Sequence, residues 1–441
     1  MSALQIIAVA ITVGLNALDG FDVLSISFAS PGIAAEWGID RAALGIVLSM
    51  ELIGMAIGSL ALGGLADKIG RRPTMLGCLA VMAIGMFMAT TVKGIYDLCF
   101  WRILTGLGIG GLLAAINAVA AEFSNARRKH LCVSIMAIGY PVGAVVGGIV
   151  AADLLESYTW RSVFYFGSAV TTAFIPLVLI FIPESVHWLT RKQPANALEK
   201  INKALQRMGH AAVSALPAIS PEVRKRSVTD IFAPGLIVTT ILVAAGYFFH
   251  ITTFYYTLKW IPKIVVDMGF AASSAAGVLV WANVGGALGG AVLGILTQKF
   301  SVKGLTIGAM LLSTVGVILF GQTPADLDKL ALAVAFAGFF SNGAIVGMYA
   351  IFAQAFPTHV RASGTGFGIG IGRGGSVLAP IIAGFLFQSG ASIGMVSFWM
   401  GMGSFVAAIV ISFLKLKPET PQSETEGEQQ PAGLRGATSA S

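Results

Sequence analysis

The feature that most constrains this chain is a series of uninterrupted apolar runs, each about 20 residues long. A helix rises about 1.5 Å per residue, so such a run spans the roughly 30 Å hydrocarbon core of a bilayer. The chain is 56% hydrophobic and only 11% charged, which is too apolar for a soluble protein. The runs are also too long and too continuous for barrel strands. We therefore predict an all-α membrane protein, since helices satisfy their own backbone in lipid.

Twelve such runs are present, and the longest connection divides them into two sets of six. The predicted spans lie at 4–30, 42–62, 74–92, 96–121, 131–152, 161–182, 235–261, 273–296, 304–321, 328–352, 362–388 and 392–414. We expect an N-terminal six-helix bundle at 1–182, a central cytoplasmic loop at 183–234, a C-terminal six-helix bundle at 235–414 and a disordered cytoplasmic tail at 415–441. An amphipathic helix is predicted within the central loop, at 196–208.

Lys and Arg residues are unevenly distributed over the connections. Of the 28 such residues, 20 fall in alternate connections and the tail, 6 fall in the opposite connections, and Arg102 and Arg373 lie within spans. The six include Lys259, which we expect at the membrane interface beside Trp260. Because basic residues stay on the cytoplasmic side, we expect both termini in the cytoplasm and a multi-pass protein of the bacterial inner membrane. The same bias explains the net charge of +7 without a nucleic-acid partner.

The two sets of spans look like repeats of one another. With a shift of 231 residues, Gly54 and Gly58 coincide with Gly285 and Gly289, and two basic loop residues coincide with two more. Two six-span repeats describe a transporter whose halves rock about a site near the membrane midplane.

The connection between the second and third spans reads GGLADKIGRRP, from Gly63 to Pro73. This segment resembles the loop signature of the major facilitator superfamily. The glycines allow close helix contact, and Asp67 can pair across the loop. The resemblance implies the major facilitator fold. It also implies a conformational role for the loop and for the basic segment after span four, at Gly63, Asp67, Lys68, Arg71, Arg72, Glu122 and Arg128.

Further segments resemble the aromatic acid:H+ symporters, one branch of that superfamily. They are DGFD at Asp19–Asp22, RILTGLGIGG at Arg102–Gly111 with AEFSNARRK at Ala121–Lys129, PESVHWL at Pro183–Leu189, and GIGRGGSVLAP at Gly370–Pro380. The chain departs from that family at Ser124, where a proline is common, and in the unusually aromatic span seven. The resemblance implies import of an aromatic or related organic carboxylate together with protons.

Three acids fall inside predicted spans. Asp19 and Asp22 lie three residues apart and so share one helix face, about 22 Å along the first span. Two neighbouring buried carboxylates repel each other, and an ionised one costs several kcal/mol in lipid. A carboxyl in that position can carry a proton across; the alternative is a static ion pair, for example with Arg102. Glu51, in the second span, is either a second proton site or a packing partner.

Two arginines are candidate anchors for an anionic substrate. Arg373 lies near the middle of span eleven among several glycines, and its planar fork fits a carboxylate. Alternatively it bridges to Asp19, Asp22 or Glu51. Arg102 lies nearer the outer end of span four, and substrate contact there competes with an internal ion pair.

Polar and aromatic residues at similar depth complete the predicted substrate site. An aromatic ring can stack on such side chains, although ordinary helix packing also accounts for each of them. The candidates are Asn283, Tyr140, Trp281, His250 and Tyr255. His250 has hydrogen-bonded packing as its alternative role.

No phosphate loop, metal-ligand spacing or catalytic triad is present, so we expect no enzyme, no cofactor and no metal. The expected partners are a small organic anion, protons and the lipid bilayer, and the expected state is a monomer. The sequence leaves open a sugar or polyol porter, another metabolite porter, or an exporter of aromatic compounds of the same superfamily.

Overall fold

The computed structural model describes residues 1–125, 128–217, 228–357 and 360–416. Twelve of its helices are long and apolar enough to cross a membrane, in agreement with the twelve predicted spans. Their bounds are α1 Ala3–Trp37, α2 Arg41–Ala61 continued by α3 Gly63–Ile69, α4 Arg71–Ala89, α5 Ile95–Glu122, α6 Lys129–Ser157, α7 Arg161–Phe181, α10 Ile237–Asp267, α11 Ala272–Leu296, α12 Val302–Gln322, α13 Leu327–Ala355, α14 Arg361–Gln388 and α15 Ile393–Ser412.

Three short helical elements lie between α7 and α10. They are α8 Val186–Lys192, α9 Ala197–Arg207 and the 3-10 turn Val228–Phe232. The predicted amphipathic helix is α9, whose buried residues Ala197, Ile201 and Ala204 lie at helical spacing on one face. The predicted disordered tail lies outside the described residues from position 417 onward.

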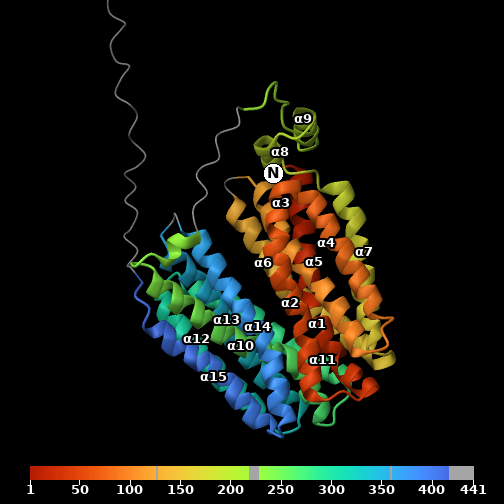
Figure 1. Cartoon of the computed structure of the whole chain (residues 1–441), viewed down its shortest axis with the longest axis vertical. Helices are drawn as coiled ribbons and strands as arrows, with labels where there is room; N and C mark the ends of the chain where they lie inside the picture. The colour runs from red at the N-terminus through yellow and green to blue at the C-terminus, as the bar shows by residue number, and fades with distance from the viewer. Residues whose placement is uncertain (126–127, 218–227, 358–359, 417–441) are drawn as a thin grey trace, which may run out of the picture.

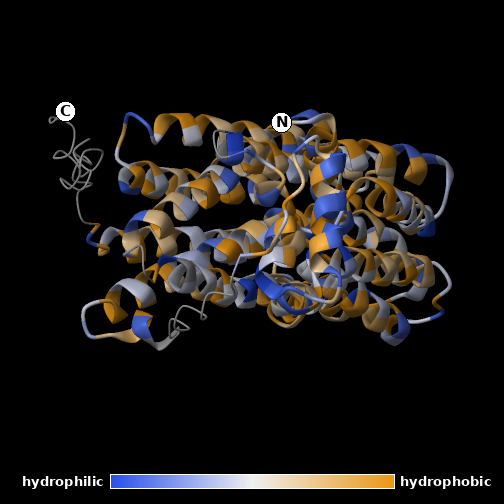
Figure 2. Cartoon of the chain, turned by 90° about the horizontal axis from the view of Figure 1, so that it is seen from above, coloured by the Kyte–Doolittle hydropathy of each residue, from blue (hydrophilic) through white to orange (hydrophobic). Residues whose placement is uncertain are grey.

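The helices form two six-helix bundles with equivalent pairings, α1–α7 and α10–α15 (Figure 1). In the first bundle α2 packs on α5, α1 on α6, and α4 on both α5 and α7. In the second bundle α11 packs on α13, α10 on α14, and α12 on both α13 and α15. Each pairing in one bundle thus has its counterpart in the other, which confirms the predicted repeat. Hydrophobic residues extend along the helices of both bundles, and hydrophilic residues gather at the connections and short helices (Figure 2).

Glycines explain why the repeated pairings are so close. A Cβ atom added to Gly54 would lie 2.1 Å from the Ile103 carbonyl oxygen of α5. At the equivalent position in the second bundle, a Cβ on Gly285 would lie 2.0 Å from the Ala335 carbonyl oxygen of α13. Only a residue without a Cβ fits there, so the glycines matched by the shift of 231 have the same packing role.

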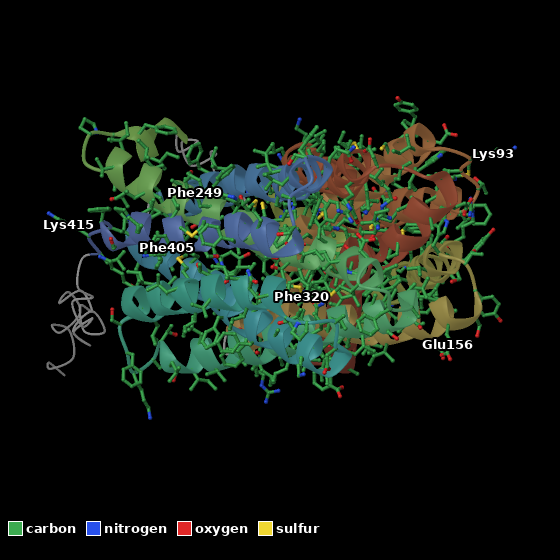
Figure 3. The ribbon with its side chains drawn as sticks, turned by 90° about the horizontal axis from the view of Figure 1, so that it is seen from below. Lys93, Glu156, Phe249, Phe320, Phe405 and Lys415 are labelled. Carbon is green, nitrogen blue, oxygen red and sulfur yellow. The ribbon has the colours of Figure 1, made fainter. Side chains whose placement is uncertain are left out.

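The bundles touch at one end and diverge toward the other (Figure 1). We call the end with α8 and α9 the basic end, and the opposite end the sealed end. At the sealed end Arg41 of α2 pairs with Asp267 of α10 at 3.1 Å, and its guanidinium lies over the Phe387 ring of α14. Nearer the middle, the Ser49 hydroxyl donates to the Val377 carbonyl oxygen at 2.7 Å. In Figure 3, Lys93 and Glu156 mark the far edge of the first bundle, and Phe249 and Phe405 lie in the second.

Candidate functional site

Five charged side chains form a buried cluster where the two bundles meet. Asp19 and Asp22 come from α1, Glu51 from α2, Arg102 from α5 and Lys259 from α10. Asp19 is 2% exposed, and the other four are 0% exposed. Arg102 pairs with Glu51 at 2.5 Å, and the Lys259 ammonium lies 3.7 Å from the same carboxylate. We call these five residues the acid cluster.

The two aspartates differ from Glu51 in having no ion pair among the described residues. No carboxylate oxygen of the three acids has a hydrogen-bond partner there, and Glu51 is held by its ion pair with Arg102. Arg102 donates to the main-chain oxygen of Asp22 at 3.1 Å, not to its carboxylate. Asp22 is nevertheless within electrostatic range of Arg102, whereas the principal charged neighbours of Asp19 are Asp22 and Glu51, both acids. The static pair of an aspartate with Arg102, one of the two predicted alternatives, is therefore replaced by a pair between Arg102 and Glu51.

Lys259 does not lie at the membrane interface, and that prediction is wrong. Its side chain is fully buried, and its ammonium donates to the Val23 carbonyl oxygen of α1. The helix that carries it extends to Asp267, beyond the predicted span end at 261. Lys259 is therefore a candidate site residue that was not predicted from the sequence.

Arg373 lies in α14, half-buried, with no ion pair among the described residues. The predicted bridge from Arg373 to Asp19, Asp22 or Glu51 is thus not formed. A Cβ added to Gly370, one turn toward the basic end, would meet nothing within 4 Å, so no neighbouring helix covers α14 at that position. A charged fork without an ion pair can accept a carboxylate.

Two tyrosines of one neighbouring helix lie near Arg373, and a third tyrosine contacts one of them. Tyr247 and Tyr255, both on α10, lie within electrostatic range of it. The hydroxyl groups of Tyr247 and Tyr349 are 3.3 Å apart, and Tyr349 is 47% exposed. Tyr255 packs against the apolar core of each bundle and against the core at the sealed end. Tyr255 was predicted from the sequence, whereas Tyr349 was not, because it lies in an otherwise ordinary apolar run.

The other predicted substrate residues do not all lie together. Tyr140 and Asn283 line one small pocket between α6, α10, α11 and α13, with a volume of about 50 Å³. Because holding benzene takes a cavity of about 150 Å³, this pocket is too small for an aromatic ring. His250 is fully buried within the second bundle, where its ring nitrogens lie 2.8 Å from the Ser404 hydroxyl and 2.9 Å from the Ser341 carbonyl oxygen.

Trp281 lies on a different face of α11 from Asn283. It is 54% exposed and shares its face with three other exposed apolar residues, Leu288, Val292 and Ile295. An apolar stripe of this kind is what a helix presents to lipid.

The loop signature forms a network at the basic end of the first bundle. Arg71 donates to the Asp67 carboxylate at 2.8 Å and pairs with Glu122 of α5 at 3.3 Å. The Glu184 carboxylate accepts from the main-chain N–H of Arg71 at 2.9 Å, at the start of α4. The predicted residues Asp67, Arg71 and Glu122 are therefore brought together, and Glu184 is an addition from the PESVHWL segment.

The remaining residues predicted for this region are arranged less tightly. Arg72 donates its side chain to the Leu179 carbonyl oxygen of α7, whereas Lys68 and Arg128 are exposed. Gly63 is the first residue of α3.

Two six-helix membrane bundles that close at one end over a charged interior define a transport protein of the alternating-access type. Comparison with known families agrees. The family model described as Major Facilitator Superfamily matches residues 12–325 and 243–440. The chain belongs to the Major Facilitator Superfamily and is a multi-pass membrane transporter, not an enzyme.

Several curated relatives are transporters of aromatic acids. The gallate transporter of Pseudomonas putida is 29% identical over 397 residues, covering 89% of this chain and 88% of that protein. The 4-hydroxybenzoate transporter PcaK of the same organism is 30% identical over 366 residues, covering 82% and 81%. The 3-(3-hydroxy-phenyl)propionate transporter of Escherichia coli is 27% identical over 412 residues, covering 92% and 93%.

A solved structure agrees on the fold. The inward-open xylose transporter XylE of E. coli superposes with a TM-score of 0.71 at 18% identity, covering 95% of this chain and 97% of that one.

Proposed function

We propose that this transporter is a proton-coupled symporter that imports an aromatic or related organic carboxylate across the bacterial cytoplasmic membrane. The observation that carries the proposal is the acid cluster, which holds three carboxyl groups and two cations in a fully buried position. Arg373, which has no ion pair among the described residues, lies within electrostatic range of Tyr255 and completes the proposed site.

The charge count of the acid cluster supports proton binding. Three ionised carboxylates and two cations leave one negative charge uncompensated, so the cluster is neutral when one carboxyl is protonated. At an effective dielectric constant of about 20, two unit charges about 4 Å apart interact by about 4 kcal/mol. An uncompensated buried charge is therefore expensive, and one exchangeable proton removes the cost. We propose Asp19 as the proton carrier, because its principal charged neighbours are acids, whereas Asp22 lies close to Arg102.

Substrate recognition in this proposal rests on Arg373 and the tyrosines. The guanidinium binds the substrate carboxylate, and Tyr247, Tyr255 and Tyr349 contact the ring and its hydroxyl groups. The relatives named for gallate, 4-hydroxybenzoate and hydroxyphenylpropionate support a ring that carries both a carboxylate and a hydroxyl.

The Lys and Arg bias of the connections supports cytoplasmic termini, so the sealed end faces outward and the structure is inward-facing. One chain contains both bundles and the whole proposed site, which supports a monomeric transporter.

The test is uptake of labelled 4-hydroxybenzoate, gallate and benzoate into proteoliposomes with an acidic exterior. The wild type is expected to accumulate at least one of these acids, and a protonophore abolishes the accumulation. Arg373→Gln is expected to lower uptake about tenfold or more, because hydrogen bonds to charged groups contribute about 1.5–3 kcal/mol. Arg361→Gln is the matched control, since Arg361 lies on the same helix but is exposed at the basic end. Asp19→Asn is expected to lose accumulation and keep exchange of labelled for unlabelled substrate.

Each alternative function has its own outcome in this assay. Transport of xylose or a polyol with no effect of Arg373→Gln would point to a neutral-sugar porter. Accumulation that requires an acidic interior, in vesicles where the protein has the same orientation, would point to an exporter. Uptake that is indifferent to the pH gradient overturns the symport proposal.

A further inference from the structure

Lys259 joins the two bundles inside the membrane. It belongs to α10 of the second bundle, yet both of its polar partners belong to the first. Its ammonium donates to the Val23 carbonyl oxygen of α1 and lies 3.7 Å from the Glu51 carboxylate of α2. The side chain is 0% exposed, so its charge is compensated by protein groups and not by water.

These contacts exist because the sealed end is closed. The nearby contacts between the bundles are the Ser49 hydroxyl with the Val377 carbonyl oxygen and the Arg41 pair with Asp267. Opening of the sealed end would separate α10 from α1 and α2 and would carry Lys259 away from the carboxyl groups. Arg102 stays with Glu51, because both residues belong to the first bundle.

We infer that Lys259 competes with a proton for the acid cluster, so that closure of the sealed end inserts a fixed cation and expels a proton toward the basic end. The inference rests on the proposed symport function. With the sealed end open, three carboxyl groups face Arg102 alone, and two protons make the cluster neutral. With it closed, Lys259 supplies one of those positive charges, and one proton is enough. One proton is released per cycle, and the released proton comes from a carboxylic acid that returns to its ionised form.

The groups that face the acid cluster support this count. They are Asp19 and Asp22 on α1, Glu51 on α2, Cys78 on α4, Arg102 on α5, Tyr140 on α6, and Tyr255 and Lys259 on α10. Arg373 on α14 is a charged neighbour of Tyr255 and stands outside the cluster. Phenol and thiol groups are neutral at physiological pH, so the balance lies between the three carboxyls and the two cations of the cluster. A lysine is suited to this exchange because its compact charge sits on a long flexible stem.

The experiment separates net uptake, which needs proton release, from substrate exchange, which does not. Lys259→Met keeps the stem and removes the charge. We expect net uptake about tenfold lower than wild type at neutral internal pH, with a smaller reduction in the exchange of labelled for unlabelled substrate. Raising the internal pH by about one unit or more should restore net uptake, because an alkaline interior removes the proton that Lys259 no longer expels. Lys263→Met is the matched control, since Lys263 lies one turn away and pairs with Asp267 on its own helix.

A charge-matched double variant, Lys259→Met with Glu51→Gln, tests the inference where the single variant fails to insert. Its closed cluster has the wild-type net charge, so exchange should be faster than in Lys259→Met alone, while net uptake stays low because closure inserts no cation. If Lys259→Met keeps net uptake with the wild-type dependence on internal pH, the inference is overturned. It is also overturned if the double variant recovers net uptake. A wild type that ignores the pH gradient would instead contradict the symport proposal itself.

Discussion

Gly45 provides a way to shift the balance between the closed and open states without touching a charge. It lies on α2 and faces α14 across the seam between the bundles. A Cβ added there would lie 2.4 Å from the Pro380 carbonyl oxygen and 3.2 Å from the Gly384 Cα. Ordinary van der Waals contact begins at 3.4 Å, so Gly45→Ala requires the two helices to separate by close to an ångström.

The cost of that overpacking sets the size of the effect. Inserting a methyl group into a well-packed contact costs about 1–3 kcal/mol. Because the clash lies between bundles, opening the sealed end relieves it while each bundle stays folded. The equilibrium between the open and closed states should therefore shift toward the open state by about 5–150-fold.

The assay is the alkylation rate of a cysteine placed at Ser49, in a chain whose three native cysteines are replaced. Ser49 is fully buried in the seam, so a reagent added on the side of the sealed end reaches it only in the open state. Gly45→Ala is expected to speed alkylation about fivefold or more. The control is Gly58→Ala, whose Cβ would lie 2.1 Å from the Leu107 carbonyl oxygen within the first bundle. Opening the seam gives that clash no relief, so the control lowers thermal stability without speeding alkylation. An unchanged alkylation rate in Gly45→Ala, with the same loss of stability as the control, would refute the reasoning.

Two further predictions concern residues whose surroundings differ sharply. Arg102→Met leaves the buried Glu51 with Lys259 as its remaining cation, and removing one partner of a buried pair costs about 3–5 kcal/mol. Thermal unfolding in detergent should show this loss of stability at neutral pH, and a smaller loss at acidic pH, where carboxyl groups are neutral. A variant whose stability follows pH in parallel with wild type would contradict this prediction. Trp281→Leu should change uptake by about twofold at most, because exposed positions away from the site tolerate substitution. A tenfold loss of affinity in a binding assay would instead return Trp281 to the substrate site.

The span pattern and the repeat were predictable from sequence, because lipid imposes length and hydropathy on every helix that crosses it. The ends of the spans were less predictable. The first predicted span ends at 30, yet α1 continues through Pro31 to Trp37. Proline removes a backbone donor, and the Ser30 hydroxyl compensates by donating to the Ser27 carbonyl oxygen at 2.8 Å. A hydropathy profile does not detect a compensating hydrogen bond of this kind.

Lys259 was misplaced for a related reason. The predicted seventh span ends at 261, because Lys263 and Asp267 look like the start of a polar loop. In the structure these two side chains pair one turn apart on α10, so the helix continues to Asp267 and Lys259 moves into the interior. Charges at the spacing of one helical turn neutralise each other, whereas hydropathy counts each of them as polar.

The depth of a residue along its span does not determine which acid pairs with Arg102. From the sequence we predicted an aspartate of the first span, Asp19 or Asp22, as the acid that could pair with Arg102, because the direction in which each helix faces is not known from depth. Gly106 decides the outcome, because a Cβ there would lie 2.0 Å from the Glu51 carbonyl oxygen. This close contact between α2 and α5 brings Arg102, one turn away, to the Glu51 carboxylate. The aspartates are thereby left without an ion pair among the described residues. Glycine packing within one bundle thus determines which acid pairs with Arg102, and which carboxyl groups stay open to the proposed proton exchange.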